Sequence, residues 1–211
     1  MKIKDIASVC RRTKMLTIFT NPDNDQQYVS NGYAIYRLCG LPYMTENTML
    51  TVFNVEGKEL DKWHCHMRPT TDTLSVKDFE ENEVQVEKEF PTIVNKGKVL
   101  LPLATPNGIV AIDPSLLKPC SEDYQSLWVR ENNGTEHIVV KSGMEFEALI
   151  LPIRLNDEAL VADLYDMANR IDVQIQRNKQ AAAYEAEKAK AELDLLMEKG
   201  KPEFKVLPED E

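Results

Sequence analysis

The fold is decided by residues 108–155, which read GIVAIDPSLLKPCSEDYQSLWVRENNGTEHIVVKSGMEFEALILPIRL. The apolar run at 108–112 predicts a short strand. The Asp113-Pro114 pair after it is typical of a helix start, because aspartate caps free N–H groups and proline fits the first turn. We therefore expect a short helix of about two turns at 114–122. Alternating apolar residues and turn signals then predict a three-strand meander with strands at 126–131, 136–141 and 145–155.

The first 55 residues predict the same order of elements. Residues 2–13 form an amphipathic helical pattern, in which Ile3 and Ile6 lie on the apolar face and the opposite face is basic. Asn31-Gly32 predicts a type I′ hairpin turn, which needs two positive φ angles. The strands expected around this turn lie at 15–20, 27–30 and 33–38, with a fourth at 49–55. Helix followed by antiparallel strands thus occurs twice, at 1–55 and at 108–155, with little residue identity between the halves.

Two other regions differ from these repeats. Residues 69–98 are acidic with weak alternation, and we interpret them as an exposed excursion with one edge strand at 83–88. Residues 156–199 contain neither proline nor glycine, and their Ala, Glu, Lys and Leu content predicts one long helix. The sequence therefore predicts an α+β body at 1–155, a long helix at 156–199 and a disordered tail at 200–211.

The segment 108–155 resembles the closing half-domain of bacterial DNA polymerase sliding clamps. In those proteins a strand, a helix and three strands end in an "MP-x-RL" segment, which 151–155 (LPIRL) matches here. A clamp domain consists of two helix-plus-strands repeats, and the order predicted for 1–155 has that form. The resemblance implies antiparallel sheets with two short helices in a DNA-clamp-like domain, a fold without enzymatic activity.

The clamp resemblance also implies partners. In a clamp ring the helices face duplex DNA with lysine and arginine, and a surface groove receives short peptides from polymerases. A ring of six such domains would need six copies of this chain. The corresponding DNA-binding candidates are Lys4, Arg11, Arg12 and Lys118. Such phosphate contacts would be nonspecific and sensitive to salt. The alternative is that these residues are only solvated helix positions, and a small basic face of this kind is common.

The long helix carries an apolar or small-residue stripe that repeats every 11 residues, a spacing of 3.67 residues per turn. Such a stripe stays almost straight and disfavours a left-handed two-stranded zipper. The helix would be about 65 Å long, so its distal half would overhang the body. We expect it to form a homo-oligomer, and the alternative is a free helix stabilised only by propensity and by ion pairs such as Glu185–Lys188. The candidate contact residues are Ala182, Ala186, Ala189 and Leu193.

Composition limits the classes of protein that fit. Of the 211 residues 43% are apolar and 28% charged, which is ordinary for a globular chain. Lys and Arg number 25 against 35 Asp and Glu, and the formal charge of −10 opposes nonspecific nucleic-acid binding unless basic groups gather on one face. No apolar run approaches the roughly 18 residues of a membrane span, and no signal peptide is recognisable. We expect a cytoplasmic protein with no membrane partner.

Catalytic chemistry has few candidates in this sequence. Motifs for nucleotide binding, serine hydrolysis and zinc proteolysis are absent, so we expect no enzyme and no cofactor. On a strand, His64 and His66 would share one face as two possible metal ligands, and the third histidine is His137. A solvent-facing strand with Trp63 and Cys65 turned inward is the interpretation we favour, so no metal site is predicted. The four cysteines lack CxxC spacing and are expected as reduced thiols.

These patterns favour a non-enzymatic, sliding-clamp-like accessory or scaffold protein associated with DNA replication and replication proteins, with a phage or mobile-element origin as an accompanying hypothesis. The main alternative is a self-associating structural or adaptor protein that has the fold and no DNA contact. A metal-dependent enzyme using His64 and His66 is a distant third. The partner, the subunit number and the process cannot be predicted from one sequence.

Overall fold

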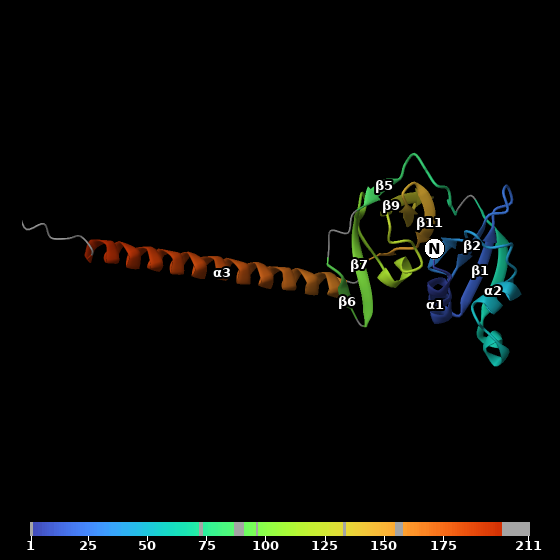
Figure 1. The fold of residues 1–211 in the computed structure, drawn as a ribbon, viewed down its shortest axis with the longest axis horizontal. Helices are drawn as coiled ribbons and strands as arrows, with labels where there is room; N and C mark the ends of the chain where they lie inside the picture. The colour runs from blue at the N-terminus through green and yellow to red at the C-terminus, as the bar shows by residue number, and fades with distance from the viewer. Residues whose placement is uncertain are drawn as a thin grey trace, which may run out of the picture. The chain divides into compact units, whose positions relative to one another are not determined.

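The structure is a computed structural model that describes residues 2–71, 74–86, 91–95, 97–132, 134–154 and 158–199. The chain forms two compact units, Met1–Leu155, called the body below, and Asn156–Glu211, which contains the long helix α3. The body is α+β with mostly antiparallel sheets, as the sequence predicts (Figure 1). The predicted tail at 200–211 lies outside the described residues.

The body repeats one arrangement twice. Helix α1 (Ile3–Thr13) precedes strands β1 (Met15–Thr20), β2 (Gln27–Ser30) and β3 (Ala34–Arg37). In the second half, β8 (Gly108–Ile112) and the 3-10 helix η2 (Pro114–Leu117) precede β9 (Gln125–Asn132), β10 (Thr135–Ser142) and β11 (Glu145–Ile150). The two meanders join through their last strands, because β3 pairs antiparallel with β11.

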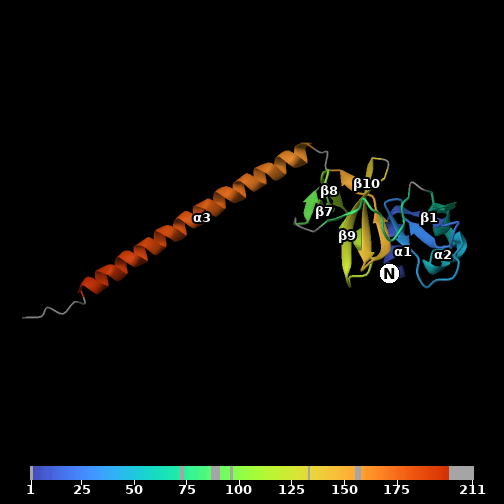
Figure 2. The ribbon, with the colours of Figure 1, turned by 90° about the horizontal axis from the view of Figure 1, so that it is seen from above.

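The joined meanders form an eight-stranded sheet in the order β4-β1-β2-β3-β11-β10-β9-β5. Strand β4 (His64–Pro69) pairs parallel with β1 at one edge, and β5 (Val84–Val86) pairs with β9 at the other. Figure 2 shows β9 and β10 side by side. A second sheet has the order β12-β8-β7-β6, with β6 at Ile93–Asn95, β7 at Lys98–Thr105 and β12 at Ile153–Arg154.

The large sheet is covered on both faces. One face carries the main core, in which Ile6 and Cys10 of α1 pack with Leu103 of β7 and Ile138 of β10. The other face carries a smaller core around Tyr28, Val139 and Phe146, with Leu74 and Val76 packed against it. We call residues 74–83 the strap, because they cover this second face.

Two predicted elements differ in the structure. The strand predicted at 49–55 is instead a helix, α2 (Glu46–Val52), which starts with a capping box between Thr45 and Thr48 and buries Met49 and Leu50. The 3-10 helix η1 (Gly57–Lys62) follows it. The helix predicted at 114–122 is only the four-residue η2, although Asp113 caps it and Pro114 begins it as expected. Pro119 has no N–H to extend the helical bonding, which accounts for the short length.

The predicted type I′ turn at Asn31-Gly32 is also wrong. Only Gly32 has a positive φ, of 89°. The Asn31 side-chain oxygen accepts hydrogen bonds from the N–H groups of Tyr33 (3.0 Å) and Ala34 (2.9 Å), so the side chain shapes the turn without a left-handed Asn31.

Helix α3 (Glu158–Lys199) has 42 residues, which confirms the predicted long helix (Figures 1 and 2). Apart from the half-buried Leu164, its described side chains are exposed, the apolar Met167, Ile171 and Ile175 of the stripe among them. Among the described residues, no helix combines the length and the apolar character needed to cross a bilayer.

Candidate binding cleft

A cleft of about 670 Å³ lies in the body where the end of α1 and the segment around η2 face the small sheet. Its walls come from distant parts of the sequence: Arg12, Thr13, Asn31, Tyr33, Gly97, Lys98, Val99, Leu100, Asp113, Pro114, Ser115, Leu116, Lys118, Leu151 and Ile153.

Apolar side chains supply much of the cleft wall. Tyr33, Val99, Leu151 and Ile153 line it and are between 43% and 58% exposed. The Leu151 N–H donates to the Tyr33 carbonyl oxygen at 2.8 Å, and Ile153 pairs with Ala111 in the small sheet. Backbone bonds therefore fix the positions of Tyr33, Leu151 and Ile153 at the cleft wall.

The charged side chains of the cleft are mostly basic. Arg12 contacts Asp113 through Nη1 and Oδ2 at 3.4 Å, and both side chains are partly exposed. The side chains of Lys98 and Lys118 are exposed and have no hydrogen-bond or ion-pair partner among the described residues. Three basic residues and one acidic residue give the cleft a net charge of about +2, within a chain whose total is −10. The cleft thus suits a ligand that is both apolar and acidic.

The four predicted DNA-binding residues are exposed, but only two of them line this cleft. The segment 113–122 runs beside α1, because the Lys2 N–H donates to the Pro119 carbonyl at 2.8 Å and Arg12 contacts Asp113. Arg12 and Lys118 face the cleft. Lys4 lies elsewhere on α1, and the Arg11 guanidinium donates to the Phe53 carbonyl.

Acidic side chains offset much of the positive charge near α1. Lys2 contacts Glu122 at 2.8 Å and Lys14 contacts Glu59 at 2.5 Å, in addition to the Arg12–Asp113 pair. These ion pairs are exposed and each contributes little to stability, yet they reduce the field that a phosphate backbone would meet. Of the four candidates, Lys4 and Lys118 have no partner among the described residues.

The histidine pair lies as the favoured interpretation predicts. His64 and His66 are exposed on β4, while Trp63 is buried and Cys65 half-buried. His137 is on β10, five strands from β4 in the sheet order, which corresponds to about 24 Å. Within the described part of the chain, no group of three His, Cys, Asp or Glu side chains could hold a metal ion.

All four cysteines are free. Burial raises the pKa of the Cys10 and Cys120 thiols to about 12, so neither is a thiolate at neutral pH. These two thiols therefore serve as core side chains and not as nucleophiles.

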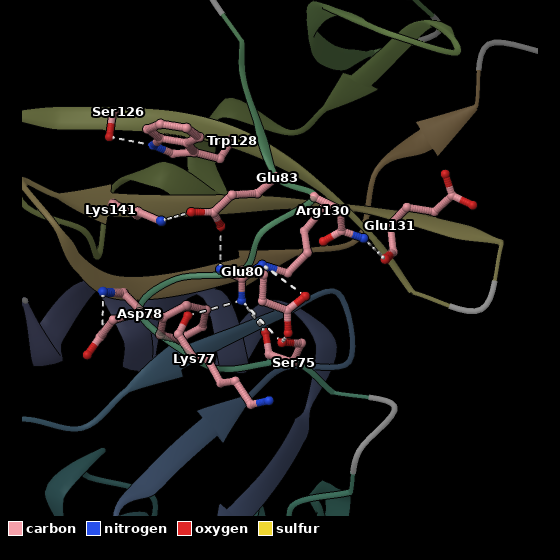
Figure 3. A network of polar contacts seen from close by, with 12 residues as sticks. Ser75, Lys77, Asp78, Glu80, Glu83, Ser126, Trp128, Arg130, Glu131 and Lys141 are labelled. Carbon is pink, nitrogen blue, oxygen red and sulfur yellow. Dashed lines mark hydrogen bonds and ion pairs between the residues drawn. The ribbon is translucent and has the colours of Figure 1, made fainter.

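The sequence analysis missed a buried ionic network beneath the strap (Figure 3). Arg130 and Lys141 are 1% exposed, and the Glu83 side chain between them is 2% exposed. Arg130 Nη2 lies 2.5 Å from one Glu83 oxygen, and Lys141 Nζ contacts the other. The Lys141 ammonium also lies 4.8 Å from the Trp128 ring centroid, a cation–π distance.

Backbone groups of the strap complete this network. Arg130 Nη1 donates to the carbonyl oxygens of Ser75 (2.8 Å) and Lys77 (3.0 Å). At one end Asp78 accepts from the Phe146 N–H at 2.8 Å and from Arg37 at 3.1 Å. The excursion predicted to be exposed is therefore bound to the sheet here, although Arg130 Nε, 3.9 Å from a Glu80 oxygen, has no hydrogen-bond partner among the described residues. These contacts tie the strap to β9, β10 and β11.

Three of the four predicted oligomerisation residues on α3 have described side chains. Ala182, Ala186 and Ala189 are exposed. The side chain of Leu193 is outside the described part of the structure.

Comparison of the chain with family models, with curated proteins and with solved structures found no match.

Proposed function

We propose that this protein is a non-enzymatic, self-associating scaffold, in which a clamp-like body is joined to a long helix that contacts other copies of the chain. One observation carries the proposal: α3 places apolar side chains in water along most of its described length. Ile171 and Ile175 are 51% and 45% exposed and lie on the 11-residue stripe. A single helix has no core of its own, so covering this stripe by a like helix is what would stabilise it.

Two matched substitutions test the association. Ile171 and Val173 are both 51% exposed, but they lie about 200° apart around the helix. Ile171→Glu places a charge on the stripe, whereas Val173→Glu places the same charge away from it. We expect Ile171→Glu to lower the mass measured by light scattering at high concentration, with Val173→Glu close to the parent. A parent that is monomeric at every concentration, or equal effects of both variants, would contradict the proposal.

A second candidate function, contact with duplex DNA in the manner of a clamp, is favoured by a specific observation. The two meanders join symmetrically through β3 and β11, and the helical segments of both halves lie side by side with Lys4 and Lys118 exposed. This arrangement is what the clamp resemblance implies for a DNA-facing surface, and the peptide groove of a clamp would correspond to the cleft. The offsetting ion pairs near α1 are the reason for placing this function second.

Lys4 and Lys118 provide the cleanest test of DNA contact, because neither has a partner whose loss would disturb the fold. The double change Lys4→Glu and Lys118→Glu is expected to weaken binding of a fluorescent duplex at low salt at least tenfold. Lys62→Glu, an exposed lysine in η1, is the control. Equal binding by parent and double variant, or an equal loss in Lys62→Glu, would remove the DNA candidate and leave the scaffold proposal standing.

A further inference from the structure

The cleft has both apolar walls and unpaired cationic side chains, and together these two features limit the chemical classes of ligand that fit it. Tyr33, Leu151 and Ile153 offer apolar contact, while Lys98 and Lys118 offer charge without a competing partner among the described residues. A ligand that fits both features is an extended segment with two or three large apolar side chains next to carboxylates. The acidic strap has that composition, but it is already engaged by Arg130 and Lys141.

The C-terminal tail of the chain has the same composition. Residues 201–211 read KPEFKVLPEDE, with Phe204, Val206 and Leu207 followed by Glu209, Asp210 and Glu211. Two lysines against four acidic residues give the tail a charge of −2, which complements the +2 of the cleft.

Chain length prevents the apolar part of the tail, Phe204 to Leu207, from reaching Ile153 in the cleft of its own copy. Helix α3 has 42 residues and spans about 63 Å. The five residues from Ile153, in the cleft, to Glu158 span at most about 18 Å. The end of α3 is therefore at least about 45 Å from Ile153, in any arrangement of the two units. From there to Leu207 the chain reaches at most about 29 Å, which falls short.

We propose that the cleft binds the tail of a second copy, residues 201–211, with its apolar side chains between Tyr33, Leu151 and Ile153 and its terminal carboxylates beside Lys98 and Lys118. This inference rests on the clamp-like cleft and adds a second contact to the self-association through α3. Because each copy then offers one cleft and one tail, the contact is head-to-tail, and it closes a ring or extends a chain.

The first experiment measures tail binding directly, on the full chain. Phe204→Asp with Leu207→Asp, called the tail variant, removes the competing tail of the protein itself. A fluorescent peptide of residues 200–211 is then titrated into it, beside a peptide of scrambled order. We expect saturable binding of the native-order peptide that weakens as salt is raised. Equal binding of both peptides, or no binding, would overturn the proposal.

Matched changes in the tail variant locate the binding site. Leu151 in the cleft and Leu60 in η1 are 43% and 42% exposed. Leu151→Asp is expected to weaken peptide binding at least tenfold, and Leu60→Asp is expected to leave it unchanged. Lys98→Glu with Lys118→Glu should also weaken it, and a peptide with Lys at 209, 210 and 211 should recover part of the loss. Equal effects of Leu151→Asp and Leu60→Asp would overturn the assignment.

Mixing tests whether the contact joins two copies. Full chains carrying either Leu151→Asp or the tail changes are each expected to show a lower mass than the parent. An equal mixture of the two should recover a larger species, because an intact tail then meets an intact cleft. Tail variant chains that keep the parent's mass through α3, without binding the peptide, would overturn tail docking while the scaffold proposal survives. If the peptide binds but Ile171→Glu leaves the mass measured by light scattering unchanged, only the proposed contact through α3 would be overturned.

Discussion

The body and α3 expose opposite kinds of side chain. In the body, Arg130 and Lys141 are 1% exposed although each carries a full charge. In α3, Ile171 and Ile175 are 51% and 45% exposed although both are apolar. Each arrangement is unfavourable for an isolated side chain, because burial removes water from a charge and exposure leaves apolar surface in water.

The difference lies in where the compensation comes from. Glu83, the backbone carbonyls of the strap and the Trp128 ring contact the two buried cations, so the body itself supplies most of the compensation, although Arg130 Nε has no hydrogen bond among the described residues. Among the described residues of its unit, helix α3 has no second layer that could cover Ile171 and Ile175. The body therefore compensates its buried charges by itself, whereas the apolar stripe of α3 would be covered only by the partner proposed above.

The largest expected effect comes from removing the anion of the network. Glu83→Ala leaves Lys141 buried without its counter-charge and leaves Arg130 only Glu80, 3.9 Å from its Nε, and breaking a buried pair in this way costs about 3–5 kcal/mol. Denaturant unfolding of parent and variant measures the loss. Glu81→Ala, a neighbouring exposed carboxylate, serves as the control and should be within about 0.5 kcal/mol of the parent. Similar losses in both variants would mean that the strap does not depend on Glu83.

A somewhat smaller loss is expected from the apolar core of the body. Ile138 on β10 is 0% exposed and belongs to the main core. Ile138→Ala removes buried methyl groups and leaves a cavity, at a cost of about 2–5 kcal/mol in the free energy of unfolding. The same denaturant curves measure it. A loss below about 1 kcal/mol would show that this part of the sheet can collapse around the missing side chain.

Much of the fold could be predicted from the sequence because it depends on local patterns. The amphipathic α1, the two meanders and α3 each follow from periodicity and turn residues within short windows. The strand predicted at 49–55 is wrong because a short apolar run fits a strand as well as a helix. The capping box formed by Thr45 and Thr48 starts a helix there instead. Strand β7 was not predicted, since Pro102 within it weakens the pattern.

The candidate site was harder to predict because its residues are distant in sequence. Arg12 and Lys118 were selected for another role, whereas Tyr33 and Lys98 carry no pattern of their own. The ionic network presents the same difficulty. Glu83 lies 47 residues before Arg130, and a single sequence gives no sign that the two side chains meet. The sequence shows one general sign of this contact, which is that the strap is acidic whereas Arg130 in β9 and Lys141 in β10 are basic.

The pH dependence of stability tests whether Glu83 stabilises the body in its charged form. Burial by itself raises the pKa of the Glu83 carboxyl, but hydrogen bonds from Lys141 and Arg130 and their charges outweigh it, so its pKa lies below the usual value. A depressed folded-state pKa means that Glu83 stabilises the body above about pH 4.3, the unfolded value, and that this contribution is lost as the pH falls through the folded pKa. Denaturation midpoints of Glu83→Gln should therefore fall less steeply with acid than those of the parent. Parallel curves would contradict this assignment.

The smallest effect on the unfolding free energy is expected in α3, and it completes the comparison with Ile138. Ile171→Ala removes the same side chain as Ile138→Ala, but from a half-exposed helix position. In dilute solution the change should stay within about 0.5 kcal/mol, since alanine is also the better helix former. At high concentration the lost apolar contact should weaken association at least tenfold, because covering such a side chain contributes about 1.5–3 kcal/mol. Thermal unfolding at low concentration and sedimentation at high concentration separate the two quantities. A large loss in dilute solution would mean that Ile171 packs within its own chain, and the contrast between a self-sufficient body and a helix that needs a partner would then fail.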